Sequence, residues 1–117
     1  MDADQFRKRT KGFGLRILRL VASLPNSPAS QVIGRQLLRA GTSIGANYRA
    51  ACRARSRADF VAKMKISEEE CDESLYWLEI LVEAGGVKVE SAAHLMKEGN
   101  EILSLLVSSI KTARAGR

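Results

Sequence analysis

The chain has 117 residues, 45% of them apolar and 27% charged, which is typical of one folded soluble domain and excludes a disordered chain. Its net charge of +6 is unevenly placed, because residues 1–65 hold 14 Lys or Arg against 3 acids whereas residues 66–117 hold 5 against 10. Two interpretations are open: the two parts attract each other within or between subunits, or the basic part binds a polyanion such as RNA or DNA.

The N-terminus and the cysteines indicate a cytoplasmic protein. Acids precede bases in the first twelve residues and no apolar core follows them, so we expect no signal peptide. The segment Leu15–Leu24 is too short and too charged to span a bilayer. Cys52 and Cys71 lie in helical patterns without metal-ligand spacing, and we expect both to be buried free thiols in a reducing compartment.

The first half of the chain predicts two helices. The first is expected over residues 3–24, with a start that frays or bends at Gly12 and Gly14, since each glycine costs about 1 kcal/mol in a helix interior. The second is expected over residues 28–54, capped by Ser27 with Pro28 in its first position. Three glycines within it, at positions 34, 41 and 45, indicate close approach of a neighbouring helix; a backbone surface for phosphate is the alternative.

Two further helices follow. The third is expected over residues 57–84, begun by the Ser56-x-x-Asp59 capping pattern and ended by Gly85-Gly86. The fourth is expected over residues 89–113 with a heptad seam. Matched lengths and short turns predict an all-α fold, an antiparallel up-down-up-down four-helix bundle in which residues 1–117 form a single domain.

Apolar residues at helical spacing give the expected buried stripe of each helix. These stripes are Phe6, Phe13, Ile17, Leu20 and Leu24 in the first; Ile33, Leu37, Ala40, Ile44 and Ala51 in the second, with Tyr48 at its edge; Phe60, Met64, Ser67, Cys71, Leu75, Leu78 and Val82 in the third; and Ala92, Met96, Gly99, Leu103, Leu106, Ile110 and Ala113 in the fourth.

The sequence gives no support for catalysis. A di-metal site in a bundle needs Glu-x-x-His pairs on two helices, but the one histidine, His94, stands four residues after Glu90, the wrong spacing. We interpret His94 as an ordinary histidine beside the apolar seam. No nucleophile motif or phosphate loop occurs either. We therefore expect no catalytic residue, no metal and no cofactor, and a protein that is not an enzyme.

The arginines are the most informative polar residues. Six of them on the second helix and its turn are candidate nucleic-acid contacts: Arg35, Arg39, Arg49, Arg53, Arg55 and Arg57. Because few aromatics are free to stack on bases, binding would be directed at the phosphate backbone and sensitive to salt. Acids within residues 68–73 are expected to pair with Arg49, Arg53 or Arg57 when they are not simply solvated.

Two smaller polar or aromatic sets leave alternatives open. Arg39, Ser43 and Asn47 share one helix face, as a recognition ridge or as a hydrogen-bond network. Tyr76 and Trp77 cannot both face inward, so one of them lies either at a subunit interface or half-buried at the bundle edge.

The sequence around several of these residues resembles that of a known protein family. The chain is similar to the four-helix-bundle family of the protein encoded by intervening sequences in bacterial 23S ribosomal RNA genes. The similarity rests on an Arg-Ala-x-x-Ser-Ile-x-x-Asn core, followed by a basic turn and a late acid-Ser-x-x-x-Leu-Glu stretch. The matching residues are Arg39, Ala40, Ser43, Ile44, Asn47, Glu73, Ser74, Leu78 and Glu79. Gly-Ala-Asn-Tyr-Arg stands where many members have Glu-Gly after the Asn.

The resemblance implies a homopentamer with a central channel. It also implies kinship with the accessory protein of diversity-generating retroelements, a basic pentamer that binds a reverse transcriptase and nucleic acid. Two functional hypotheses result. In the first, a non-catalytic homo-oligomer binds RNA or DNA backbone through its arginine-rich face. In the second, the protein is a structural or protein-binding adaptor whose arginines form subunit contacts.

Overall fold

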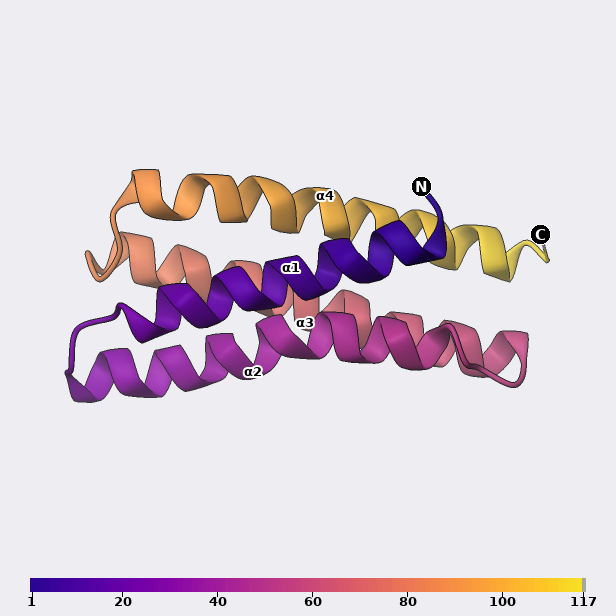
Figure 1. Ribbon diagram of the computed structural model, residues 1–117, viewed down its shortest axis with the longest axis horizontal. Coiled ribbons are helices and arrows are strands. Elements are labelled where there is room, and N and C mark those ends of the chain that lie inside the picture. Colours follow the sequence, from indigo (N-terminus) through magenta and orange to yellow (C-terminus); the bar gives the residue numbers. More distant parts are fainter. Residues whose placement is uncertain (117) are drawn as a thin grey trace.

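A computed structural model describes residues 1–116 as four α-helices: α1 (Ala3–Ala22), α2 (Pro28–Ala51), α3 (Arg57–Glu83) and α4 (Val89–Arg114). Each helix runs antiparallel to the one before it, in a body of 47 × 22 × 20 Å (Figure 1). The all-α, up-down-up-down four-helix bundle predicted from the sequence is therefore confirmed. α1 and α2 end two and three residues earlier than expected, at Ala22 and Ala51.

The start of α1 is more regular than the sequence suggested. The Asp2 carboxylate accepts a hydrogen bond from the backbone N–H of Gln5 at 2.8 Å, and the Gln5 side chain accepts one from the N–H of Asp2. This capping box satisfies two N–H groups that would otherwise lack partners. It counteracts the weakness of Gly12 and Gly14, and α1 is continuous through both glycines.

The starts of α2 and α3 follow the predicted pattern in part. Ser27 caps α2, with Pro28 in the first turn. Ser56 accepts a hydrogen bond from the N–H of Asp59 at 3.1 Å and so caps α3. The carboxylate of Asp59 does not complete the box, because it pairs with Lys63 one turn further on.

Close contact between α1 and α2 explains the glycines of α2. A Cβ at Gly45 would stand 3.2 Å from Thr10 Oγ1, and one at Gly34 would stand 3.2 Å from Val21 Cγ1. At Gly41 the same atom would stand 2.9 Å from Ile17 Cγ2. The prediction of close helix approach is therefore confirmed.

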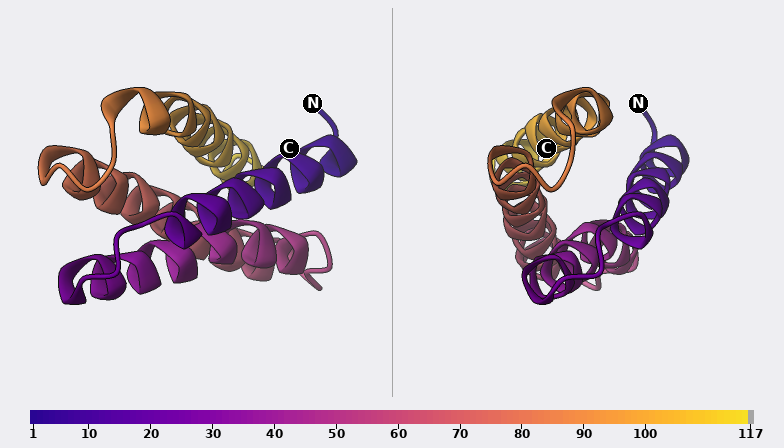
Figure 2. Two further views of the ribbon diagram at one scale, coloured as in Figure 1. Left: turned by 60° about the vertical axis from the view of Figure 1, so that its left-hand side comes forward. Right: turned by 90° about the vertical axis from the view of Figure 1, so that its left-hand side faces the viewer.

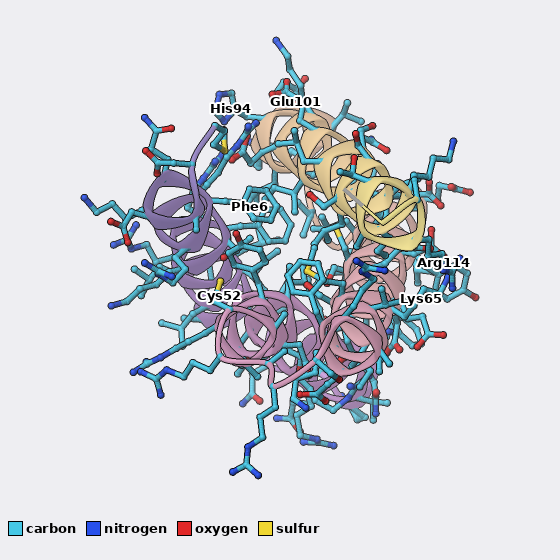
Figure 3. The ribbon with its side chains drawn as sticks, turned by 90° about the vertical axis from the view of Figure 1, so that its right-hand side faces the viewer. Phe6, Cys52, Lys65, His94, Glu101 and Arg114 are labelled. Atoms are coloured by element: carbon cyan, nitrogen blue, oxygen red, sulfur yellow. The ribbon has the colours of Figure 1, made fainter. Side chains whose placement is uncertain are left out.

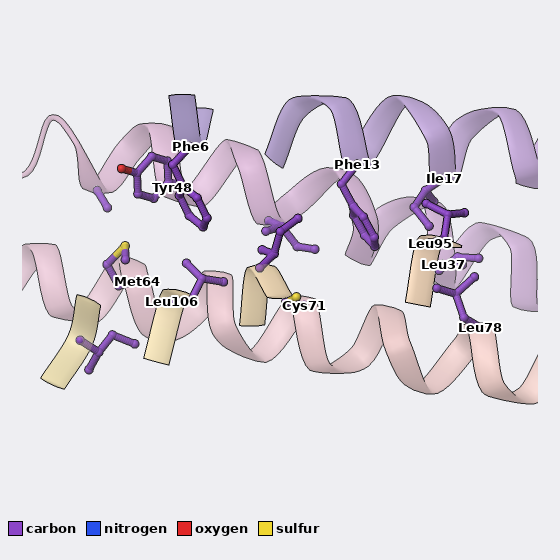
Figure 4. Packing of buried hydrophobic residues seen from close by; sticks show 14 of the residues in the cluster. Phe6, Phe13, Ile17, Leu37, Tyr48, Met64, Cys71, Leu78, Leu95 and Leu106 are labelled. Atoms are coloured by element: carbon purple, nitrogen blue, oxygen red, sulfur yellow. The ribbon is translucent and has the colours of Figure 1, made fainter. Parts of the chain in front are cut away.

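The core runs the length of the bundle between all four helices (Figure 4). Most expected positions are buried, but α4 uses Leu95 and Ile102, whereas Met96 and Leu103 are half-buried. Apolar residues lie on both flanks of α4, so spacing alone could not choose between them. Other expected core residues are also half-buried or replaced by a neighbour. Leu20, Leu24, Ile33, Phe60 and Ala113 are half-buried, and Leu81 is buried in place of Val82.

The helices surround the core in chain order (Figures 2 and 3). α2 packs extensively on both α1 and α3, and α3 packs on α4. α1 and α4 close the ring over only a short length, and the backbones of diagonally opposite helices do not approach each other closely. The seam between α1 and α4 is therefore the least packed of the four.

Candidate nucleic-acid interface

Antiparallel packing gathers positive charge at one end of the bundle. The start of α1, the α2–α3 turn and the end of α4 all lie at this end, on the right of Figure 1 and facing the viewer in Figure 3. Arg57 illustrates the convergence, because its Nη1 lies 3.6 Å from the position of a Cβ at Gly116, just beyond α4. We call residues 1–12, 45–65 and 103–116 the basic end.

The basic end differs greatly in charge from the rest of the bundle. The basic end holds twelve Lys or Arg and three acids, while the rest of the described chain holds six Lys or Arg and ten acids. A field of this kind attracts polyanions from a distance and is screened over about 8 Å at physiological ionic strength. The bundle is thus electrically polarised along its long axis.

The basic end contains four of the six arginines expected at a nucleic-acid site: Arg49, Arg53, Arg55 and Arg57. All four side chains are exposed, and no ion pair involves them within residues 1–116. The expectation that they pair with the acids of residues 68–73 is therefore wrong. Glu70 and Glu73 instead meet Arg39, which lies about three helical turns before Arg49 on α2.

Arg39, and not Arg49, Arg53 or Arg57, pairs with acids of residues 68–73. Its guanidinium donates to Glu70 at 2.7 Å and also to Glu73, which joins α2 to α3. The indole N–H of Trp77 donates to the same Glu73 carboxylate at 3.0 Å. These donors, Trp77 first and Arg39 second, lower the pKa of Glu73. Arg39 thus has a structural role, and Arg35 lies near the opposite end of α2.

Other motif residues also hold the fold together. The Ser43 hydroxyl donates to the Arg39 carbonyl, and the Asn47 amide donates to the Ser43 carbonyl, each within α2. These bonds agree with the interpretation of this face as a hydrogen-bond network, and both of them lie within α2. Ala40 and Ile44 are fully buried. Ser74 is buried too and bonds the Glu70 carbonyl of its own helix.

The two aromatics of α3 differ in exposure. Tyr76 is 53% exposed, whereas Trp77 is half-buried at the bundle edge. Their rings meet edge to face with centroids 5.0 Å apart.

A groove of about 740 Å³ lies between α1 and α2 and extends the basic end along the bundle. Its basic residues are Arg7, Lys8, Lys11, Arg49 and Arg53, and its apolar and small residues include Leu15, Leu18, Gly14, Gly45 and Ala46. The close α1–α2 contact at the glycines forms the floor of this groove. We call it the α1–α2 groove.

Polar pairs close the seam between α1 and α4. Arg9 binds Glu98 through two contacts of 2.7 Å and reaches Glu101 at 2.5 Å. These bonds lower the pKa of Glu98 and raise that of Arg9. Further along the same seam, the Arg16 guanidinium lies 2.5 Å from His94 Nδ1. Arg9 is therefore part of the fold and is not available to a ligand.

The cysteines differ from each other. Cys71 is fully buried, and its thiol donates to the Gly99 carbonyl at 3.3 Å. Burial, with a smaller contribution from Asp72, raises the pKa of Cys71 to about 12. Cys52 is exposed and lines the α1–α2 groove, so the expectation that it is buried is wrong. Residues 1–116 contain no group of three or more potential metal ligands.

Sequence reasoning missed the contribution of α4 to the basic end. Lys111 and Arg114 lie in the last turn of α4, but the division of the chain at residue 65 placed them with the acidic part. An antiparallel bundle of four helices returns the C-terminus to the N-terminal end. That rule, applied to the charges, would have found them.

Comparison with known proteins agrees with the fold. The family model described as 23S rRNA-intervening sequence protein matches residues 4–108. A crystal structure from Bacteroides thetaiotaomicron, of a protein of unknown function from the S23 ribosomal protein family, is 39% identical, with a TM-score of 0.88. The alignment covers 95% of this chain and 99% of that one. No curated protein is significantly similar. None of the helices within residues 1–116 has the length and apolar character needed to cross a membrane.

Proposed function

The chain belongs to the 23S rRNA-intervening sequence protein family, and from that premise we propose that it is a non-catalytic homo-oligomer that binds RNA or DNA backbone in the cytoplasm. The observation that carries the proposal is the axial polarity of charge. Nine of the twelve cations at the basic end support it, and all but Arg7, which pairs with Asp4, are exposed and form no ion pair within residues 1–116: Arg7, Lys8, Lys11, Arg49, Arg53, Arg55, Arg57, Lys111 and Arg114.

The chemistry of the basic end favours phosphate over bases. Arginine presents a planar fork of donors that suits phosphate oxygens, and five of the six arginines in this set are exposed. Of the three aromatic rings at this end, Phe6 and Tyr48 are buried and pack edge to face at 4.7 Å, and Phe60 is half-buried against the core. None of the three is an exposed platform for stacking on bases. Binding therefore depends on backbone charge and releases counterions.

Titration of a 20-base-pair RNA duplex, followed by fluorescence anisotropy at several salt concentrations, tests this proposal. The double variant Arg55→Glu/Arg57→Glu should bind at least tenfold more weakly and lower the slope of log affinity against log salt by about 2. Arg19→Glu/Arg35→Glu is the matched control, since it changes the net charge equally at the opposite end. Equal weakening by both variants, or no binding by the wild type, contradicts the proposal.

We propose that the assembly contains five subunits, as the family resemblance implies. Light scattering coupled to size exclusion, at low salt and at about 0.5 M salt, measures the subunit number and the contribution of charge. A pentamer that persists in high salt leaves the arginines of the basic end free for nucleic acid. A pentamer that dissociates in salt favours the adaptor alternative, in which arginines form the subunit contacts.

A further inference from the structure

The α1–α2 groove has a feature that phosphate does not explain. Leu15 and Leu18 lie in it and are 45% and 48% exposed. A nucleic-acid backbone would gain nothing from covering them. Beside these leucines, towards the basic end, lie Lys11 and Arg49. An occupant that matches the groove therefore carries apolar and acidic side chains on the same surface.

The outward face of α3 has that composition. Seven residues spaced by three or four positions form one exposed stripe on this helix: Ala62, Ile66, Glu69, Asp72, Tyr76, Glu79 and Glu83. Ile66 and Tyr76 are its apolar members, 44% and 53% exposed, and about 15 Å apart along the helix. We call these seven residues the α3 stripe.

The acids of the α3 stripe are unpaired, in contrast to their neighbours. Glu70 and Glu73 bind Arg39, and Glu68 lies near Lys65. No ion pair within residues 1–116 involves any of the four stripe acids, Glu69, Asp72, Glu79 and Glu83. The stripe contains no base. It is thus an amphipathic acidic surface without a partner inside the protomer.

The two surfaces cannot meet within one chain. α1 and α3 lie at opposite corners of the bundle, where their backbones do not come close to each other, and all seven residues of the α3 stripe are exposed. We propose that the α3 stripe of one copy docks in the α1–α2 groove of a second copy, with Tyr76, the larger of its two apolar residues, covering Leu15 and Leu18. The stripe acids then lie near Lys11 and Arg49 of the second copy.

This contact is heterologous, because it joins two different surfaces. Repeated from copy to copy it closes a ring if the rotation permits. Cyclic symmetry then places the basic end of every subunit at the same level along the ring axis. Several basic ends would engage one nucleic acid together, which raises affinity without new contacts. The inference rests on the homo-oligomeric part of the proposed function and assigns its interface.

A mixing experiment tests the interface. The groove variant carries Leu15→Asp and Leu18→Asp, and the stripe variant carries Ile66→Asp and Tyr76→Asp. Each should be monomeric by light scattering at concentrations where the wild type assembles. Mixed in equal amounts, they should form a 1:1 dimer and nothing larger. The groove variant keeps an intact α3 stripe, the stripe variant keeps an intact groove, and only one productive contact is possible.

A surface control separates the interface from a general effect of added charge. Val32→Asp/Val89→Asp changes two exposed valines outside both surfaces and should keep the wild-type mass. Circular dichroism checks that each variant is helical, and serine replaces aspartate where a variant loses its helical signal.

Three outcomes overturn the inference. If the groove or stripe variant keeps the wild-type mass, or if the mixture stays monomeric, this interface is wrong although the protein is still an oligomer. If the wild type itself is monomeric, the homo-oligomeric part of the proposed function fails as well. Nucleic-acid binding is measured separately, by the anisotropy titration of the Arg55→Glu/Arg57→Glu variant.

Discussion

Ile17 of α1 packs directly on Gly41 of α2. A Cβ at position 41 would stand 2.9 Å from Ile17 Cγ2, closer than real Cβ atoms approach, and 3.2 Å from Ile17 Cβ, which is also tight. Ile17 is fully buried, and its Cβ is anchored to the backbone of α1, so it cannot move aside cheaply. The spacing of α1 and α2, and with it the floor of the α1–α2 groove, depends on the absence of a side chain at Gly41.

Gly41→Ala should therefore destabilise the protein although alanine is the better helix former. Overpacking costs about 1–3 kcal/mol, and the gain in helix propensity offsets about 1 kcal/mol of it. Gly12→Ala is the matched control, because no atom lies within 4 Å of a Cβ there. It should stabilise by about 0.5–1 kcal/mol. Urea unfolding measures both, and a stabilising Gly41→Ala would show that α1 can shift without cost.

The Arg9–Glu98 pair predicts an acid sensitivity at the α1–α4 seam. The pKa of Glu98 is lowered by folding, so the pair stabilises the native state above the ordinary carboxylate pKa of 4.5. This contribution is lost as the pH falls through the lower folded-state value. At pH 7, Glu98→Gln should cost about 1 kcal/mol. The difference in stability between the variant and the wild type should therefore shrink progressively as the pH falls below 4.5.

Denaturant unfolding at pH 7, 5, 4 and 3 follows that convergence. If the two proteins keep a constant difference in the free energy of unfolding over this range, the difference arises from something other than the charge of Glu98. Arg9→Met/Glu98→Gln gives the reference in which neither charge is present.

The fold could be predicted because its signals are local. Ser27-Pro28 and Gly85-Gly86 mark helix boundaries through capping and turn chemistry, and helical spacing identifies the core of α2. The buried face of α4 could not be fixed, because Leu95 and Met96 are both apolar. The choice between them comes from packing on α3 and α1, which no spacing within α4 records.

The candidate site was predictable only where it depends on one segment. Arg53, Arg55 and Arg57 are close in sequence and lie together at the basic end. Lys111 and Arg114 join them through the topology of the bundle. The partners of Arg39 depend on the axial register between α2 and α3, and charge signs alone do not give that register.

Ser67 provides a test of the contact between α2 and α3. Its buried hydroxyl donates to the Ile44 carbonyl of the neighbouring helix at 2.8 Å. Ser67→Ala should destabilise by about 0.5–1.5 kcal/mol. Ser74 is equally buried but bonds only the carbonyl of Glu70 in its own helix. Ser74→Ala should be close to neutral, and thermal or urea unfolding would rank the two variants.

The two thiols should differ greatly in reactivity. A buried cysteine with a pKa of about 12 has almost no thiolate near pH 8, whereas Cys52 is exposed. If the α3 stripe of a second copy covers the groove, Cys52 is shielded in the assembly. The measurement therefore uses the Leu15→Asp/Leu18→Asp variant, in which the groove is open.

Reaction of that variant with a chromogenic disulfide should modify one thiol per chain under native conditions and two in denaturant. Adding Cys52→Ser to that variant should abolish the reaction seen under native conditions, so that only Cys71 reacts, and only in denaturant. If Cys71 also reacts quickly under native conditions, α3 and α4 must separate readily around Gly99, whose carbonyl accepts the hydrogen bond of the Cys71 thiol. In the wild type, slower modification of Cys52 as protein concentration rises would report occupation of the α1–α2 groove independently of mass.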